Sequence, residues 1–159
     1  MKLINNIFNL LPEKIAYAHC DIPCGIYDPH LAQLAAHTVI RMTQLISEIK
    51  TNDVKAQHDI SRMTHVKEEH AGIIEEELET LRNDYFKDEH YKEYPQLQIL
   101  LTDTLKSVSK ARQNIDMDIC QNVLSGVLQI AEIFYKTKGV TPVRVKSVYP
   151  TGGEMVFYK

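Results

Sequence analysis

Four stretches of helical periodicity most constrain how this 159-residue chain can fold. Apolar side chains recur every three or four residues over 29–50, over 54–83, from Pro95 to about residue 110, and over 117–137. Such spacing gives each helix one apolar face that must be buried. Four amphipathic helices joined by short connections predict an all-α chain, folded as an antiparallel four-helix bundle.

Local signals indicate where these helices begin and end. Asp28 and Pro29 are residues that favour a helix start, and Gly139 is suited to ending the last helix. The aromatic stretch 83–95 is expected to be a structured connection. On the first helix, the predicted core positions are Leu31, Leu34, Ala35, Thr38, Met42, Leu45, Ile46 and Ile49.

The last part of the chain, residues 139–159, has a different pattern. Residues 143–149 alternate with period two, and a Pro-Thr-Gly-Gly turn sequence separates them from the apolar run 155–158. This pattern predicts a short C-terminal β-hairpin or extended tail. An isolated hairpin is marginally stable, so we expect it to pack on the helices or on a neighbouring subunit. No function follows for it from the sequence.

Composition limits the class of protein. The chain is 44% hydrophobic and 25% charged, with a formal net charge of −3. It is long enough for one domain with a substantial core. An acidic chain without a block of lysine and arginine is not expected to bind nucleic acid. No apolar run approaches the length of a membrane span, so no membrane partner is expected either.

The first eighteen residues have two interpretations. Ala16-Tyr17-Ala18 resembles a signal-peptidase site, which would indicate secretory export. Three asparagines interrupt the apolar region before it and argue against secretion. We therefore expect residues 1–18 to be a cleaved leader, or propeptide, of a cytoplasmic protein, with export as the minority alternative.

Potential metal ligands are concentrated directly after this leader. The segment His19-Cys20-Asp21-Ile22-Pro23-Cys24 holds an imidazole and two thiols within six positions. Cys-x-x-x-Cys alone is compatible with two buried cysteines, a disulfide, a thiol redox module or half a metal site. Thiolate and imidazole together suit zinc, copper, iron or nickel. A structural zinc site would usually need a second ligand pair, and the remaining cysteine, Cys120, lies on the apolar stripe of the last helix.

The segment His19–Pro29 resembles, nearly residue for residue, the metal hook of the nickel-containing superoxide dismutases. The segments Asn83–Lys87, Asp103–Lys106 and Gln129–Lys138 resemble later parts of the same family. The resemblance covers roughly residues 19–138. It implies an N-terminal hook on a four-helix bundle within 19–138, preceded by the leader 1–18 and followed by a tail, 139–159, of unknown role.

The resemblance also implies an antioxidant oxidoreductase with a nickel ion as its cofactor. A processing peptidase would free the amine of His19, which then binds nickel through amine and imidazole. Cys20 would supply its amide and thiolate, and Cys24 the second thiolate. The enzyme would convert superoxide to oxygen and hydrogen peroxide by cycling between Ni(II) and Ni(III). A homohexamer is implied as well.

Further site residues follow from matching positions. Tyr27 corresponds to a tyrosine that limits access at the open face of the metal. Asp21 would support the hook backbone, and Tyr85 corresponds to a second tyrosine near the site. Considered without the family, Tyr85 would be an aromatic residue that packs the end of the bundle.

Two positions depart from the family pattern. Ala35 stands where the family often has an acidic residue, and His70 stands where it has an arginine. Those groups orient the axial imidazole, and such partners commonly tune a metal site. We hypothesise that His70 takes over part of the orientation of the His19 ring.

Two other functions compete with this interpretation. A non-catalytic nickel or copper binding protein could use the same N-terminal ligands without turnover. A di-iron enzyme in the bundle would need Glu-x-x-His pairs, and the chain contains none.

Overall fold

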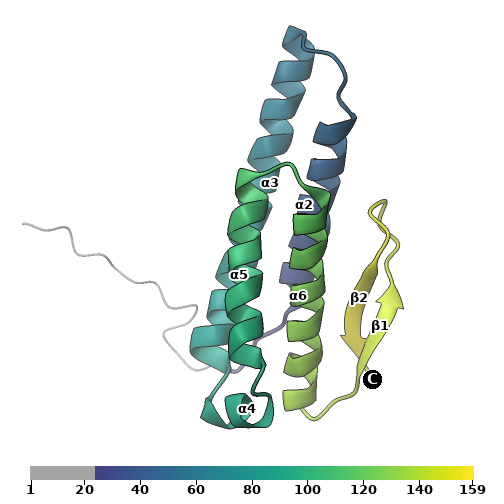
Figure 1. Cartoon of the computed structure of the whole chain (residues 1–159). Helices are drawn as coiled ribbons and strands as arrows, with labels where there is room; N and C mark the ends of the chain where they lie inside the picture. The colour runs from purple at the N-terminus through teal and green to yellow at the C-terminus, as the bar shows by residue number, and fades with distance from the viewer. Residues whose placement is uncertain (1–23) are drawn as a thin grey trace, which may run out of the picture.

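The computed structural model describes residues 24–159, and this part of the chain is mostly helical with a C-terminal β-hairpin (Figure 1). The elements are α2 (His30–Glu48), α3 (Val54–Thr80), η1 (Leu81–Tyr85), α4 (Asp88–Glu93), α5 (Leu97–Gln113), α6 (Met117–Thr137), β1 (Pro142–Lys146) and β2 (Glu154–Tyr158). The prediction of a helical chain with a terminal hairpin is confirmed. The predicted leader and the hook residues His19, Cys20 and Asp21 lie outside the described residues.

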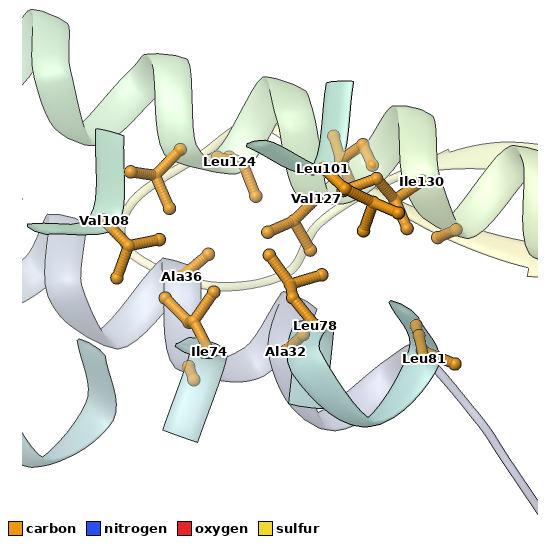
Figure 2. Packing of buried hydrophobic residues seen from close by; sticks show 14 of the residues in the cluster. Ala32, Ala36, Ile74, Leu78, Leu81, Leu101, Val108, Leu124, Val127 and Ile130 are labelled. Carbon is orange, nitrogen blue, oxygen red and sulfur yellow. The ribbon is translucent and has the colours of Figure 1, made fainter. Parts of the chain in front are cut away.

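The long helices pack side by side around a shared core. Helix α2 packs on α3 and α6, and α5 packs on the same two helices. Figure 1 shows α2 and α3 extending beyond the loop that joins α5 to α6. Figure 2 shows the side chains that meet between the helices, among them Ala32, Ala36, Ile74, Leu78, Leu101, Val108, Leu124, Val127 and Ile130. Each buried leucine or isoleucine contributes about 1.5–3 kcal/mol to folding.

Helix ends follow the local signals in the sequence. Asp53 and Asp116 accept hydrogen bonds from backbone N–H groups in the first turns of α3 and α6. At the end of α6, Gly139 has a φ of +74° and its N–H donates to the carbonyl of Lys136. The N–H of Val140 donates to the carbonyl of Tyr135, which completes a Schellman motif. The predicted end of the last helix at Gly139 is therefore confirmed.

The connection predicted over 83–95 contains regular structure of its own. A short π-helical turn, η1, continues α3, and α4 follows it. Phe86 is buried at the junction of the two, where its N–H donates to the carbonyl of Leu81. This turn carries Tyr85 to the end of the helical core.

The C-terminal hairpin docks on α2 through side chains that bond to the free edge of β2. The strands are antiparallel, with Val143 opposite Phe157. The Gln33 side chain accepts from the N–H of Val156 (2.7 Å) and donates to its carbonyl (3.1 Å). One turn further along α2, His37 Nε2 donates to the carbonyl of Glu154 (3.2 Å). These two side chains satisfy a strand edge that would otherwise be unpaired.

Docking of the hairpin changes which face of α2 is buried. Leu31, a predicted core residue, is 47% exposed, whereas Gln33, His37 and Ile40 are buried. Helix α2 packs against α3 and α6 on one side and lies against the hairpin on another. The buried surface of α2 is consequently wider than the stripe of core residues predicted from the sequence, and it is rotated around the helix relative to that stripe.

None of the helices between residues 24 and 159 combines the length and the hydrophobicity needed for a membrane span.

Candidate metal centre

Cys24 is the predicted ligand that lies within the described residues, and its thiol is free and exposed. The next residue, Gly25, has a φ of +70°, a backbone conformation that favours glycine. This turn brings the N–H of Ile26 to within 3.5 Å of Cys24 Sγ, to which it donates a hydrogen bond. The thiolate is the form of cysteine that binds metals.

The structure brings the two predicted tyrosines together directly after this turn. Tyr27 is half-buried, and its ring centroid lies 5.4 Å from that of Tyr85. Tyr85 is attached to α6, because its hydroxyl forms a hydrogen bond of 2.7 Å with Thr137 Oγ1. Its ring also packs 4.7 Å from that of Phe134. The segment that leaves the hook is thus attached to the ends of η1 and α6.

The surroundings of Tyr85 keep its phenol neutral. Burial raises the pKa of Tyr85, and the hydrogen bond with Thr137 opposes that rise in part. The His90 ring stacks on the phenol ring with a centroid separation of 5.4 Å. Because the Thr137 hydroxyl donates to the carbonyl of Phe134 (2.7 Å), the neutral Tyr85 hydroxyl donates its hydrogen bond to Thr137 Oγ1.

Lys138 is a charged residue of this region that the sequence reasoning did not single out. It is the residue that ends α6, and its Nζ lies 4.6 Å from the Tyr85 ring centroid. Within residues 24–159, Lys138 forms no salt bridge. Its positive charge therefore favours the approach of small anions. The signal in the sequence was the Thr137-Lys138 pair at the end of the resembling segment.

A pocket of about 260 Å³ opens at this end of the helical core. It is lined by Tyr27, Asp28, Phe134, Tyr135, Lys138, Val140 and Tyr158. Burial and the neighbouring Asp28 and Tyr158 raise the pKa of Tyr135 to about 12. The carboxylate of Asp28 accepts a hydrogen bond of 2.7 Å from the N–H of His30. Asp28 thus supports the start of α2 from the position before the N-cap, because Pro29 is the N-cap and not the first helical residue that the sequence predicts.

His70 and Ala35 lie apart from this pocket. His70 is half-buried on α3, where its Nδ1 donates to the carbonyl of Val66 (2.9 Å), which leaves Nε2 as an acceptor. Fifteen residues separate it from Tyr85, which is about 22 Å along a helix. Ala35 is buried on α2. The described residues therefore place Tyr27 with Tyr85 but not with His70.

The donor chemistry of the described residues fits a site that is completed from the preceding segment. Residues 24–159 contain no group of three His, Cys, Asp or Glu side chains placed to hold a metal. Cys120 is buried next to Thr43, and burial raises the pKa of its thiol. Cys24 is accordingly the thiol of this part of the chain that is available to a metal. His19, Cys20 and Asp21 lie outside the described residues.

The chain is similar to known proteins over most of its length. The family model described as nickel-containing superoxide dismutase matches residues 14–138. The superoxide dismutase [Ni] of Streptomyces coelicolor is 37% identical over 127 residues, which cover 80% of this chain and 93% of that protein. The corresponding protein of Streptomyces seoulensis is 35% identical with the same coverage. The solved native structure of a nickel superoxide dismutase is similar with a TM-score of 0.69 and 36% identity, covering 76% of this chain and 99% of that chain.

Proposed function

This chain belongs to the nickel-containing superoxide dismutase family, and we propose that it disproportionates superoxide at a nickel ion held by its N-terminal hook. The family assignment identifies it as an oxidoreductase, a superoxide dismutase, with nickel as its cofactor. The observation that carries the proposal is the free, exposed thiol of Cys24 at the start of a matched helical core.

The proposed ligands are His19, Cys20 and Cys24. His19 gives its amine and its imidazole, Cys20 its amide and thiolate, and Cys24 the second thiolate. The amine and amide nitrogens and the two thiolates would form a donor set suited to Ni(II), with the imidazole of His19 as a third nitrogen donor. When bound, the metal supplies a one-electron couple that one superoxide reduces and a second oxidises. Asp21 is proposed to support the backbone of the hook.

The described residues would attract the substrate and limit its access to the metal. Two superoxide anions and two protons give one molecule of oxygen and one of hydrogen peroxide. The charge of Lys138 favours the approach of the anionic substrate. The rings of Tyr27 and Tyr85, 5.4 Å apart, narrow the approach beside Cys24. The two protons of the reaction come from water.

The finer assignments concern processing, assembly and location. We propose that a peptidase removes residues 1–18, since His19 offers an amine only after the Ala18–His19 bond is cut. The family model matches from residue 14, which supports this proposal because the match includes residues that precede His19. We further propose that the long helices form an antiparallel four-helix bundle that assembles as a homohexamer. The interrupted apolar region of the leader supports a cytoplasmic location.

The test compares two forms of the chain after reconstitution with nickel. One begins at His19, and the other keeps residues 1–18. Superoxide consumption is followed by pulse radiolysis, and bound nickel by elemental analysis. We expect about one nickel per chain and full activity in the first form, and weak binding without activity in the second.

A matched control keeps the amine and removes one thiolate. Cys24→Ser in the chain that begins at His19 should lose nickel and activity together, because a hydroxyl is a poor donor for this couple. Full activity in the chain that retains residues 1–18 would contradict the proposed ligand set.

A further inference from the structure

The C-terminal hairpin lies beyond the matched residues 14–138, yet it forms part of the pocket beside the proposed metal centre. Tyr158 of β2 lines this pocket together with Tyr27 and Asp28. Cys24 is four residues before Asp28, and such a segment spans at most about 14 Å. A segment with no counterpart in the family match therefore lies within reach of the metal-binding turn.

A chain of contacts connects Tyr158 with the base of the hook. The Tyr158 ring packs on the Tyr135 ring with a centroid separation of 5.1 Å. Tyr135 is buried, and its side chain lines the same pocket as Asp28. The carboxylate of Asp28 accepts from the N–H of His30 at 2.7 Å. Asp28 thus lies between the start of α2 and a tyrosine that the hairpin covers.

The hairpin provides a firm support for Tyr158. The free edge of β2 is bonded to Gln33 and His37, and the neighbouring residues Met155 and Val156 are buried. On the outer side, Arg144 of β1 bridges Glu132 of α6 (2.6 Å) and Glu154 of β2 (3.2 Å). Tyr158, although 59% exposed, is consequently attached to a strand fixed on both α2 and α6.

We propose that the C-terminal hairpin is a positioning element for the metal centre. Tyr158 holds the Tyr135 side chain against Asp28, and Asp28 fixes the end of the hook that carries Cys24. Tyr135 and Tyr158 are positioning residues, because they act through Asp28 on the segment that binds the metal. This inference rests on the proposed function for the identity of the metal.

The test measures the hook in the presence and in the absence of nickel. The variants are Tyr135→Phe, which removes the hydroxyl and keeps the ring, and Tyr158→Ala, which removes the covering ring. Tyr158→Phe is the conservative variant, and Val148→Ala is the matched control, since Val148 lies on the same hairpin and is 93% exposed. Circular dichroism verifies that each variant keeps its helices.

The first readout uses the apoprotein that begins at His19, with Cys20→Ser added so that Cys24 is the accessible thiol. The rate at which Cys24 reacts with Ellman's reagent should rise about 5-fold in Tyr135→Phe and Tyr158→Ala, which corresponds to ~1 kcal/mol. Tyr158→Phe and Val148→Ala should react as the parent does. Equal rates in all four variants would overturn the inference.

The second readout uses the nickel-loaded protein with Cys20 intact. Loss of nickel to excess EDTA should be faster by a similar factor in Tyr135→Phe and Tyr158→Ala, and Tyr158→Phe should restore the slow rate. Nickel loss at the parent rate in both variants would count against the positioning role. If the parent protein binds no nickel, the proposed function fails, while the thiol rates of the apoprotein still decide the positioning role of the hairpin.

Discussion

The contact between α5 and α6 allows a prediction whose magnitude follows from the packing. A Cβ atom added at Gly126 would lie 2.2 Å from Thr104 Oγ1 and 2.9 Å from Thr104 Cγ2. Thr104 is 4% exposed, and its hydroxyl donates to the carbonyl of Leu100 at 2.7 Å, so it has little room to turn away. Overpacking of this kind costs about 1–3 kcal/mol. Loss of the threonine hydrogen bond adds ~1 kcal/mol.

Helix propensity acts in the opposite direction but is smaller. Alanine is favoured over glycine inside a helix by about 0.5–1 kcal/mol. The net effect of Gly126→Ala should therefore be to lower the free energy of unfolding by about 1–3 kcal/mol. Gly72→Ala on α3 is the matched control, because a Cβ there meets nothing within 4 Å. It should stabilise the protein by about 0.5–1 kcal/mol.

Urea unfolding followed by circular dichroism measures both changes, at one fixed protein concentration because an oligomer's stability depends on it. Adding Thr104→Ala to Gly126→Ala should recover part of the loss, because the two crowded atoms are then absent. Equal unfolding midpoints for Gly126→Ala and Gly72→Ala would refute the packing of α5 on α6 described above.

Three further predictions concern the metal centre and the hairpin. Cys120→Ser should leave nickel content and activity nearly intact, because Cys120 is buried beside Thr43. If Cys120→Ser lost its nickel while Cys24→Ser kept it, the assignment of the hook as the metal site would be wrong. His70→Ala should lower dismutation without changing nickel content if His70 orients the His19 ring, and an unchanged rate would assign His70 to helix packing alone. Burial lowers the pKa of His37, so the folded state binds fewer protons than the unfolded state and stability is lost as the pH falls below ~6.5. The urea midpoint should accordingly drop more between pH 7 and pH 5 in the parent than in His37→Gln. Equal drops would show that the pKa of His37 does not differ between the folded and the unfolded state.

The periodicity of apolar residues predicted the long helices, because the apolar face of a helix is set by the spacing of residues within that one segment. The last helix is the clearest case, since its predicted range 117–137 coincides with α6 and Gly139 ends it as expected. The first helix shows where this reasoning fails. Gln33 and His37 are buried because β2, more than a hundred residues later, lies against them, and a local pattern does not contain that contact.

In the candidate site, too, some residues were predicted from the sequence and others were not. Tyr27 and Tyr85 were matched by resemblance, and the structure places their rings in contact. The position of Lys138 and the proximity of Tyr135 to Asp28 were not foreseen, because they depend on how the end of α6 meets the residues after the hook. The π-helical turn that carries Tyr85 also gives no periodic signal of its own, since it continues the pattern of α3.

The central claim is that the chain becomes active when cleavage exposes the His19 amine to nickel. The most direct measurement is N-terminal sequencing together with elemental analysis of the protein purified from its native host. We expect a chain that begins at His19 and carries about one nickel ion. A purified, active protein that begins at another residue, or that carries a different metal in place of nickel, would contradict it.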